Sequence, residues 1–258
     1  MKEYVNTFMH YRFLLRELVK KGIKLKYRRS YLGIIWSLLE PLLTMMVLTI
    51  VFGTLFGNKD KTFPVYILTG RLLYSYYSSS TTRALKSVRA NAAMIKKVYV
   101  PKYIYPLTRI MSSLINMLIS LIPLAAVAIF SGLLPNKTYF LLPFPLLCLA
   151  LFCLGLGMLL ASAMVFFRDI QFLWGVLTTI WMYLTPIFYP ITALPETIQS
   201  VVKMNPLYFY VTFLRSCVID GLSPEPFMYV QCALIALGML AVGAFTFKKS
   251  QDNFVLYL

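Results

Sequence analysis

The chain has 258 residues, 59% of them hydrophobic, and 25 Lys and Arg against 9 Asp and Glu give it a net charge of +16. A mean hydropathy of +0.73 leaves no room for a soluble domain beside several membrane spans. A nucleic-acid-binding protein could not stay soluble at this composition, so the charge indicates membrane topology and contact with anionic lipids.

The first segment, residues 1–30, predicts a cytoplasmic amphipathic helix. Apolar residues recur in it at helical spacing among basic residues. Such a helix lies at a membrane surface with its apolar face in the lipid boundary.

Six apolar runs of spanning length follow, since a spanning helix needs about 20 apolar residues. They cover roughly residues 32–56, 63–82, 104–130, 140–166, 170–189 and 227–247. The sequence therefore predicts an all-α integral membrane protein with six transmembrane helices, in a single permease domain over residues 1–258.

Residues 190–226 do not fit a seventh span. They contain five prolines, and their longest apolar run, of about 13 residues, is too short to cross a bilayer. Pro195 and Pro206 each suit the first turn of a short helix. We predict two short re-entrant helices here, on the outer side between spans five and six.

The basic residues divide unequally between the two sides of these runs. Nineteen of the 25 Lys and Arg fall in segments on the side of the N-terminus, including nine in residues 1–30 and seven in residues 83–109. Basic loops stay cytoplasmic. Both termini are therefore expected in the cytoplasm.

Four segments, in chain order, carry a family resemblance. They are YRRSYLGIIW (27–36) followed by Glu40–Pro41, NAAMIKKVYVP (91–101), FFRDI (166–170), and TPIFYP (185–190) with Asn205–Pro206–Leu207 downstream. Together they resemble the signature segments of the type-2 ABC exporter permeases, which move O-antigen, capsule and teichoic-acid polymers.

The resemblance implies a bacterial cytoplasmic-membrane protein that forms a homodimer and docks to a separate ATP-binding subunit. That subunit would hold ATP and Mg, and this chain would bind no cofactor. Residues 91–101 would form a cytoplasmic coupling helix, with the turn at 167–169 nearby. The coupling residues implied are Asn91, Ile95, Lys96, Lys97, Pro101, Arg168 and Asp169. The alternative is that the basic ones only anchor the cytoplasmic side.

The sequence lacks the motifs that are typical of an enzyme active site. It has no G-x-x-x-x-G-K-[ST] motif to cradle a nucleotide phosphate, and its few carboxylates form no paired site. A single histidine and four cysteines without C-x-x-C spacing predict no metal site. We expect a transport permease that catalyses nothing itself.

The fifth run carries a pattern that does not depend on family. Gln171, Thr178 and Thr185 recur every seven residues, and three aromatic residues follow the same period, so all six share one helix face. Hydroxyl groups and aromatic rings suit a passing sugar chain, whereas helix packing with small polar residues is the alternative. The predicted channel residues are Tyr74, Tyr77, Gln171, Trp174, Thr178, Trp181, Thr185 and Phe188.

Two charged residues fall within spans, where a charge is costly enough to indicate function. Glu40 and Arg71 lie at similar depth, about 12 Å from opposite edges, and are predicted to neutralise each other within a subunit or across the dimer. The alternative is that Arg71 faces a water-filled passage. Arg28 and Arg29, before the first span, are candidates to receive a lipid-linked pyrophosphate.

The function predicted is the membrane subunit of an ATP-driven exporter of lipid-linked polysaccharide. One rival is a type-2 ABC permease for a drug or small lipid, which needs a lateral cavity more than a continuous tunnel. A second rival is a subunit of a membrane glycan assembly that transports nothing.

Overall fold

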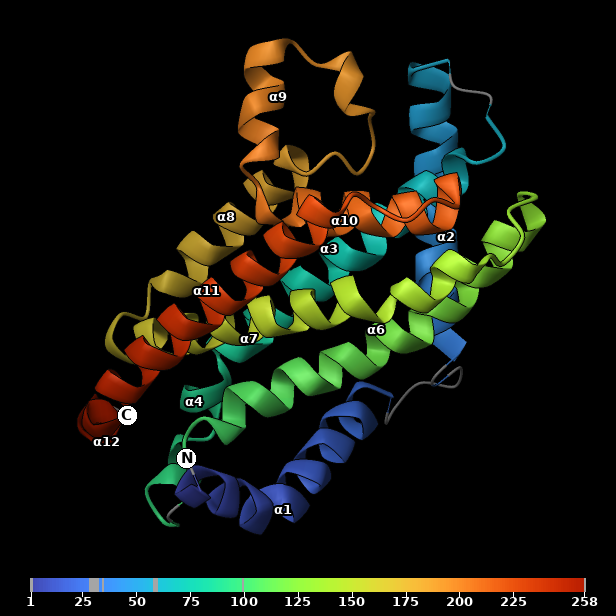
Figure 1. Cartoon of the computed structure of the whole chain (residues 1–258). Coiled ribbons are helices and arrows are strands. Elements are labelled where there is room, and N and C mark those ends of the chain that lie inside the picture. Colours follow the sequence, from blue (N-terminus) through green and yellow to red (C-terminus); the bar gives the residue numbers. More distant parts are fainter. Residues whose placement is uncertain (1, 28–32, 34, 58–59, 99, 258) are drawn as a thin grey trace.

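The computed structural model describes residues 2–27, 33, 35–57, 60–98 and 100–257; of α1, it describes the side chains of residues 11–24. Within these residues the chain is helical, without strands (Figure 1). The helices of the first half are α1 (Lys2–Tyr27), α2 (Ile35–Leu55), α3 (Phe63–Leu85), α4 (Ser87–Ala90), α5 (Ala92–Ile95) and α6 (Ile104–Phe130).

The second half has longer helices separated by short ones. It comprises η1 (Lys137–Leu141), α7 (Pro143–Phe166), α8 (Ile170–Leu184), η2 (Ile191–Ala193), α9 (Glu196–Lys203), α10 (Pro206–Arg215), η3 (Ser216–Asp220), α11 (Pro226–Ser250), η4 (Gln251–Asn253) and α12 (Phe254–Tyr257). Proline stands in the first turn of α7, α10 and α11, where its missing N–H is not needed.

Four helical stretches in the described part are long and apolar enough to cross a membrane: Ile35–Leu55, Ile104–Phe130, Lys137–Phe166 and Pro226–Tyr257. The predicted runs at 63–82 and 170–189 form α3 and α8. Of these, α8 is apolar but has only 15 residues. The other, α3, has 23 residues with two arginines and a run of hydroxyls that lower its hydropathy.

The polar helix α3 lies at the centre of the molecule. It packs against α2, α6, α7, α8 and α10, and most of its side chains are buried. By contrast, α2 lies at the edge of the molecule, and only 6% of the residues in its most apolar stretch are buried. Three of the four apolar helices, α2, α6 and α7, thus pack around a helix that sequence hydropathy alone would rank below them.

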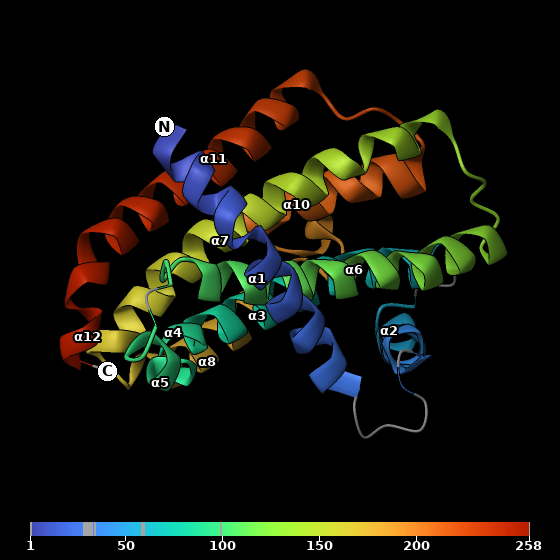
Figure 2. The ribbon, with the colours of Figure 1, turned by 90° about the horizontal axis from the view of Figure 1, so that it is seen from below.

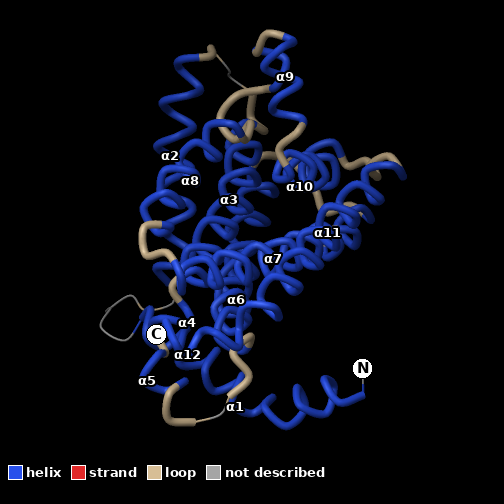
Figure 3. Tube along the Cα trace, turned by 90° about the vertical axis from the view of Figure 1, so that its left-hand side faces the viewer, coloured by secondary structure: helices blue, strands red, loops and turns tan. Residues whose placement is uncertain are grey.

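The helices are arranged so that α1, α4, α5 and α12 gather at one end of the molecule, while α9 lies at the opposite end (Figures 1 and 3). Figure 2 shows α1 crossing α6 obliquely, and the two helices are in contact. The first and last helices therefore lie at the same end of the molecule.

The closest helix contact joins α7 and α11. A Cβ atom on Gly243 would overlap the backbone of Gly155, and a Cβ on Gly155 would overlap the backbone at Met239 and Leu240. Small residues let two helix backbones approach in this way, and the approach is stabilised by van der Waals contact.

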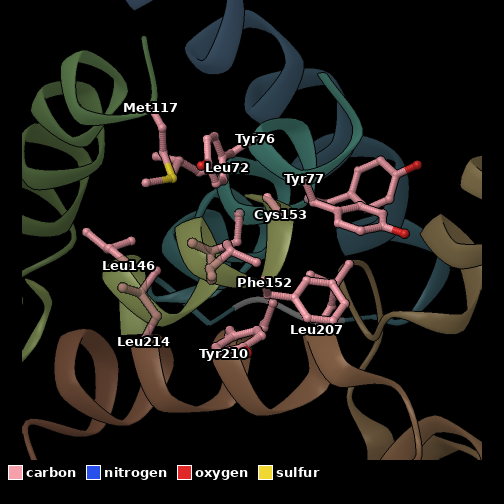
Figure 4. Packing of buried hydrophobic residues seen from close by; sticks show 14 of the residues in the cluster. Leu72, Tyr76, Tyr77, Met117, Leu146, Phe152, Cys153, Leu207, Tyr210 and Leu214 are labelled. Carbon is pink, nitrogen blue, oxygen red and sulfur yellow. The ribbon is translucent and has the colours of Figure 1, made fainter. Parts of the chain in front are cut away.

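The main core joins α3, α7 and α10. Figure 4 shows Tyr77, Phe152 and Tyr210 among its side chains, and the rings of Phe152 and Tyr210 lie 6.2 Å apart. The short helix α10 is therefore a core element, because Leu207, Tyr210 and the other apolar residues of its inner face are fully buried.

Residues 190–226 contain the two short helices predicted from Pro195 and Pro206. Pro195 precedes α9, and Pro206 opens α10 after Asn205, whose side chain accepts a hydrogen bond from the Leu207 N–H. The two helices differ in setting: α10 is buried in the core, whereas Met204 just beyond α9 is 81% exposed.

Candidate functional site

The predicted coupling segments lie at the end of the molecule that also holds α12 (Figures 1 and 2). A small buried cluster of Val88, Ala161, Val165, Phe247 and Phe254 joins α4, α7, α11 and α12 there. Ile95 and Phe166 both pack against this cluster. The same buried cluster therefore holds both α5 and the turn after α7.

Residues 91–101 do not form one helix. α5 covers Ala92–Ile95, and a turn follows it. Asn91 separates α4 from α5 and donates from its side-chain amide to the Ser87 carbonyl at 2.7 Å, while Pro101 is half-buried. The predicted single coupling helix is therefore replaced by one short helix, α5, and a turn, and the Asn91 side chain ties the segment to α4.

The exposed side chains of these segments combine charge with apolar area. They are Lys96, Lys97, Val98, Phe167, Arg168 and Asp169. Phe167 is 69% exposed and Val98 is 54% exposed. Exposed apolar side chains among charged ones are typical of a protein interface. The structure does not test which of them contact a partner, so their coupling role stays a prediction.

The helix α1 shows the amphipathic pattern expected of it, but the described apolar residues pack against α6 and the residues before it, and not into the lipid boundary that the sequence predicted. Leu14, Leu15 and Leu18 pack against a second cluster, formed by Val100, Ile104 and Tyr105. The neighbouring Arg12, Arg16 and Lys20 are exposed.

The contact with α1 also reaches the start of α6. Burial, reinforced by the neighbouring Tyr11, raises the pKa of the Tyr103 hydroxyl above its ordinary value. Arg28 and Arg29, the candidate pyrophosphate residues, lie outside the described residues.

Of the six channel residues predicted in the fifth run, Gln171, Trp174, Thr178 and Trp181 share one face of α8, as their spacing indicates. The helix ends at Leu184, so the prediction is wrong for Thr185 and Phe188, which lie in the extended segment that follows. Trp174, Thr178, Thr185 and Phe188 are buried, and Gln171 and Trp181 are half-buried, while most of the remaining helix surface is exposed. In a single copy of the chain this face packs against α3 and α2. The hydroxyl of Tyr74 donates to the Thr178 carbonyl at 2.6 Å.

The aromatic members of this set pack in the same way. The rings of Tyr77 and Trp174 lie 6.1 Å apart, and Phe188 stacks on Phe52 of α2 at 4.9 Å. The hydroxyl of Thr178 donates back to carbonyls of its own helix. This geometry agrees with the helix-packing alternative, and a role in lining a channel stays a prediction.

Glu40 and Arg71 line one pocket between α2, α3 and α6 but form no ion pair with each other. The only described polar contact of Arg71 is a long one, 3.9 Å from Nη1 to the sulfur of Met182. Glu40 is exposed. Their predicted mutual neutralisation is therefore not seen within one copy, and pairing across a dimer stays a prediction.

The role of Arg215 was not predicted from the sequence. This residue ends α10 and is only 8% exposed. Its guanidinium donates to the carbonyls of Pro186 at 2.8 Å, Tyr66 at 2.9 Å and Ile187 at 3.3 Å. Backbone carbonyls released by the break after α8 thus find donors on a single side chain.

A second pair of side chains completes this polar junction. The Asn205 amide donates to the Thr185 hydroxyl at 2.9 Å, and the Tyr66 hydroxyl donates to the Tyr189 carbonyl at 2.8 Å. The sequence signal was present: an arginine at the end of an apolar run beside prolines needs acceptors. The acceptors themselves lie too far away in the sequence to be recognised.

The described residues contain no group of three or more His, Cys, Asp or Glu that could hold a metal ion. The four cysteines are unpaired and buried. Burial in an apolar setting makes them small hydrophobic packing residues.

Comparison with known proteins connects this architecture with a family. The chain is 26% identical over 256 residues to the O-antigen export system permease protein RfbA of Myxococcus xanthus, covering 98% of each chain. It is 28% identical to RfbA of Klebsiella pneumoniae, covering 81% of each. It is 25% identical to the capsule polysaccharide export inner-membrane protein CtrC of Neisseria meningitidis, covering 91% and 92%.

A family model described as ABC-2 type transporter matches residues 14–219, well over half of the 258 residues. The match runs from α1 to η3 and so includes the coupling segments, the polar pocket and the Arg215 junction. The chain therefore belongs to the ABC-2 type transporter family.

Proposed function

We propose that this chain is the membrane-spanning subunit of an ATP-driven exporter that moves a lipid-linked polysaccharide, of the O-antigen or capsule type, across the cytoplasmic membrane. The observation that carries the proposal is the similarity to an O-antigen export permease over 98% of both chains. Since it extends through loops and short helices, the likeness is more than shared hydropathy. A teichoic-acid substrate stays a prediction from the sequence alone.

The proposal includes six spans, formed by the four apolar stretches together with α3 and α8. α3 avoids lipid contact by its central place, so its arginines do not argue against a crossing. α8 has 15 residues, about 22 Å of helix, and needs residues 185–189 to complete a crossing of about 30 Å. The re-entrant part is then α9 and α10.

The orientation proposed places α1, α5 and the turn after α7 in the cytoplasm, because basic loops stay there. Exposed Phe167 and Val98 would meet a separate ATP-binding subunit, which would hold ATP and Mg. Arg28 and Arg29, which precede the first span in the sequence, are proposed to capture the pyrophosphate.

A dimer of this chain is also part of the proposal. Exposed apolar residues of α2 and α8 offer a seam, among them Val47, Ile50, Phe172 and Val176, each at least 60% exposed. Gln171 and Trp181 are the half-exposed members of the predicted channel face, and they lie at the edge of this surface.

The test is co-purification with a candidate ATP-binding subunit, followed by ATPase assays with and without a lipid-linked glycan. We expect a stable complex whose ATPase rate rises with the glycan. Stimulation by a small lipid or drug but not by the glycan would favour the first rival. A chain that binds no ATP-binding subunit, and whose loss leaves surface polysaccharide unchanged, would contradict the proposal.

A further inference from the structure

A polar pocket of about 200 Å³ lies between α2, α3 and α6, and we call it the α2–α3–α6 pocket. Its volume is far more than a single structural water needs. Its apolar wall contains Leu72 and Met117, which lie close to Tyr76 in Figure 4. The rest of the lining is rich in hydroxyls and charges, which is unusual for a space between membrane helices.

The polar lining follows helical spacing on all three helices. On α3 the sequence Arg71, Ser75, Ser79, Arg83 repeats every four residues, and these four also line a neighbouring open pocket of about 290 Å³. Four-residue spacing places them on one face. The other two helices contribute Ser37, Glu40 and Thr44, and Ser113, Asn116 and Ser120.

Two buried hydroxyls in this lining have no hydrogen-bond partner in the described part of the chain. They are Ser113 Oγ and the hydroxyl of Tyr76, both in residues that are 3% exposed. Buried polar atoms in folded proteins are nearly always paired. The two oxygen atoms are enclosed by protein atoms and do not open into the pocket, so a ligand would be received by the polar groups of the other lining residues.

The arginines of the pocket are also incompletely satisfied. Neither Arg71 nor Arg83 forms an ion pair with a described carboxylate, although Glu40 lines the same space. A guanidinium presents a fork of N–H donors that fits the oxygens of a phosphate. A carboxylate and several hydroxyls beside it suit the hydroxyl groups of a sugar.

We propose that the α2–α3–α6 pocket binds a phosphorylated sugar unit, with its phosphate on Arg71 and its hydroxyls on the serines and Glu40. The inference rests on the proposed function, since a lipid-linked glycan carries such a unit next to its lipid. Arg83 lies near the cytoplasmic end of α3, and Arg71 lies about 18 Å further along it. The pocket therefore leads from the membrane surface towards mid-depth.

The test uses the full-length chain with Ser75→Cys, in nanodiscs made only of phosphatidylcholine. Ser75 is exposed and lines both pockets, and the four native cysteines are buried, so background labelling is low. The reaction rate with a small water-soluble thiol reagent is measured with N-acetylglucosamine 1-phosphate, with N-acetylglucosamine, and with inorganic phosphate. Thr179→Cys, exposed on α8, is the matched control.

We expect N-acetylglucosamine 1-phosphate to slow labelling at position 75 several-fold. N-acetylglucosamine alone and inorganic phosphate alone should slow it much less. Adding Arg71→Gln should weaken this protection about tenfold, the effect of losing one charge-assisted hydrogen bond. Arg71→Lys should retain part of it. Ser79→Cys, on the same face, repeats the measurement if Ser75→Cys lowers the yield of folded protein.

Three results would overturn the proposal: no protection at either position, equal protection by phosphate alone, or equal protection at position 179. Protection by phosphatidylglycerol nanodiscs without added ligand would also overturn it, because the occupant would then be a lipid headgroup. The labelling assay does not depend on transport. If cells export polysaccharide but the sugar phosphate does not protect position 75, only the proposed binding site is contradicted. If the sugar phosphate protects position 75 but cells export no polysaccharide, only the proposed function is contradicted.

Discussion

The guanidinium of Arg215 lies on the ring of Tyr66, with its carbon 3.4 Å from the ring centre, and one of its nitrogens also donates to the Tyr66 carbonyl. One side chain of α10 thus fixes α3 through both the ring and the backbone of a single residue. Gly70, one turn along α3, leaves the room this requires, because a Cβ there would lie 2.9 Å from Nη2 of Arg215.

Replacing Arg215 by Met should destabilise the fold by about 3 kcal/mol, because three carbonyls lose their donor in a buried setting. Arg215→Lys should recover only part, since one ammonium cannot reproduce the planar fork. Thermal unfolding of the purified chain measures the loss. Lys203→Met, at an exposed position, is the control, and an equal effect of both changes would contradict the role given to Arg215.

Gly243→Ala should lower stability by about 2 kcal/mol or more, because the added Cβ meets the Gly155 backbone and the helices must separate. Gly238→Ala on the same helix should be close to neutral, since nothing lies within 4 Å of its Cβ. Comparing the unfolding temperatures of the two variants checks this. Equal temperatures would mean that α7 and α11 are not in close contact.

Thr185→Val should cost more stability than Thr178→Val, by about 1 kcal/mol. The Thr185 oxygen accepts from the buried Asn205 amide, whereas the Thr178 hydroxyl bonds only to its own helix. If this face lines a channel in the dimer instead, Thr178→Trp should block export of a long polymer without unfolding the chain. Unfolding curves and surface polysaccharide levels distinguish these outcomes.

Phe167→Ala and the double change Lys96→Ala with Lys97→Ala should each weaken binding of the ATP-binding subunit about tenfold or more, because exposed aromatic and charged residues often dominate interfaces. Their unfolding temperatures should stay unchanged, since these side chains are exposed. Lys137→Ala, in η1 before α7, should leave binding intact. Co-purification measures all three, and equal retention would remove this surface from coupling.

Cysteine labelling in intact cells tests the orientation. Lys97→Cys should resist a reagent that cannot cross the membrane, whereas Lys137→Cys should react with it. The buried native cysteines provide a silent background. Labelling of position 97 from outside would reverse the proposed topology and exclude a cytoplasmic docking role.

The helices themselves could be predicted well from the sequence. The run expected at residues 104–130 coincides with α6, and Pro195 and Pro206 correctly marked the starts of α9 and α10. Periodicity also identified the inner face of α8. These features depend on local hydropathy and backbone chemistry, which neighbouring residues determine.

What covers each face could not be predicted in the same way. The hydroxyls of α8 suggested a channel, but only the three-dimensional structure shows Tyr74 and Tyr77 against them. The partners of Arg215 are up to 149 residues away in the chain. The serine repeat of α3 was readable as a periodic face, yet its counterparts on α2 and α6 became meaningful only once the three helices were seen together.

The meeting of Gly155 and Gly243 has a mechanical consequence. Because their backbones are in direct contact, α7 and α11 should move together as one rigid pair and resist sliding along or separating from each other. Any movement that opens a path through the bilayer has to be taken up by helices with fewer neighbours. Among these α2 has the greatest freedom to swing, and it carries one wall of the polar pocket with it.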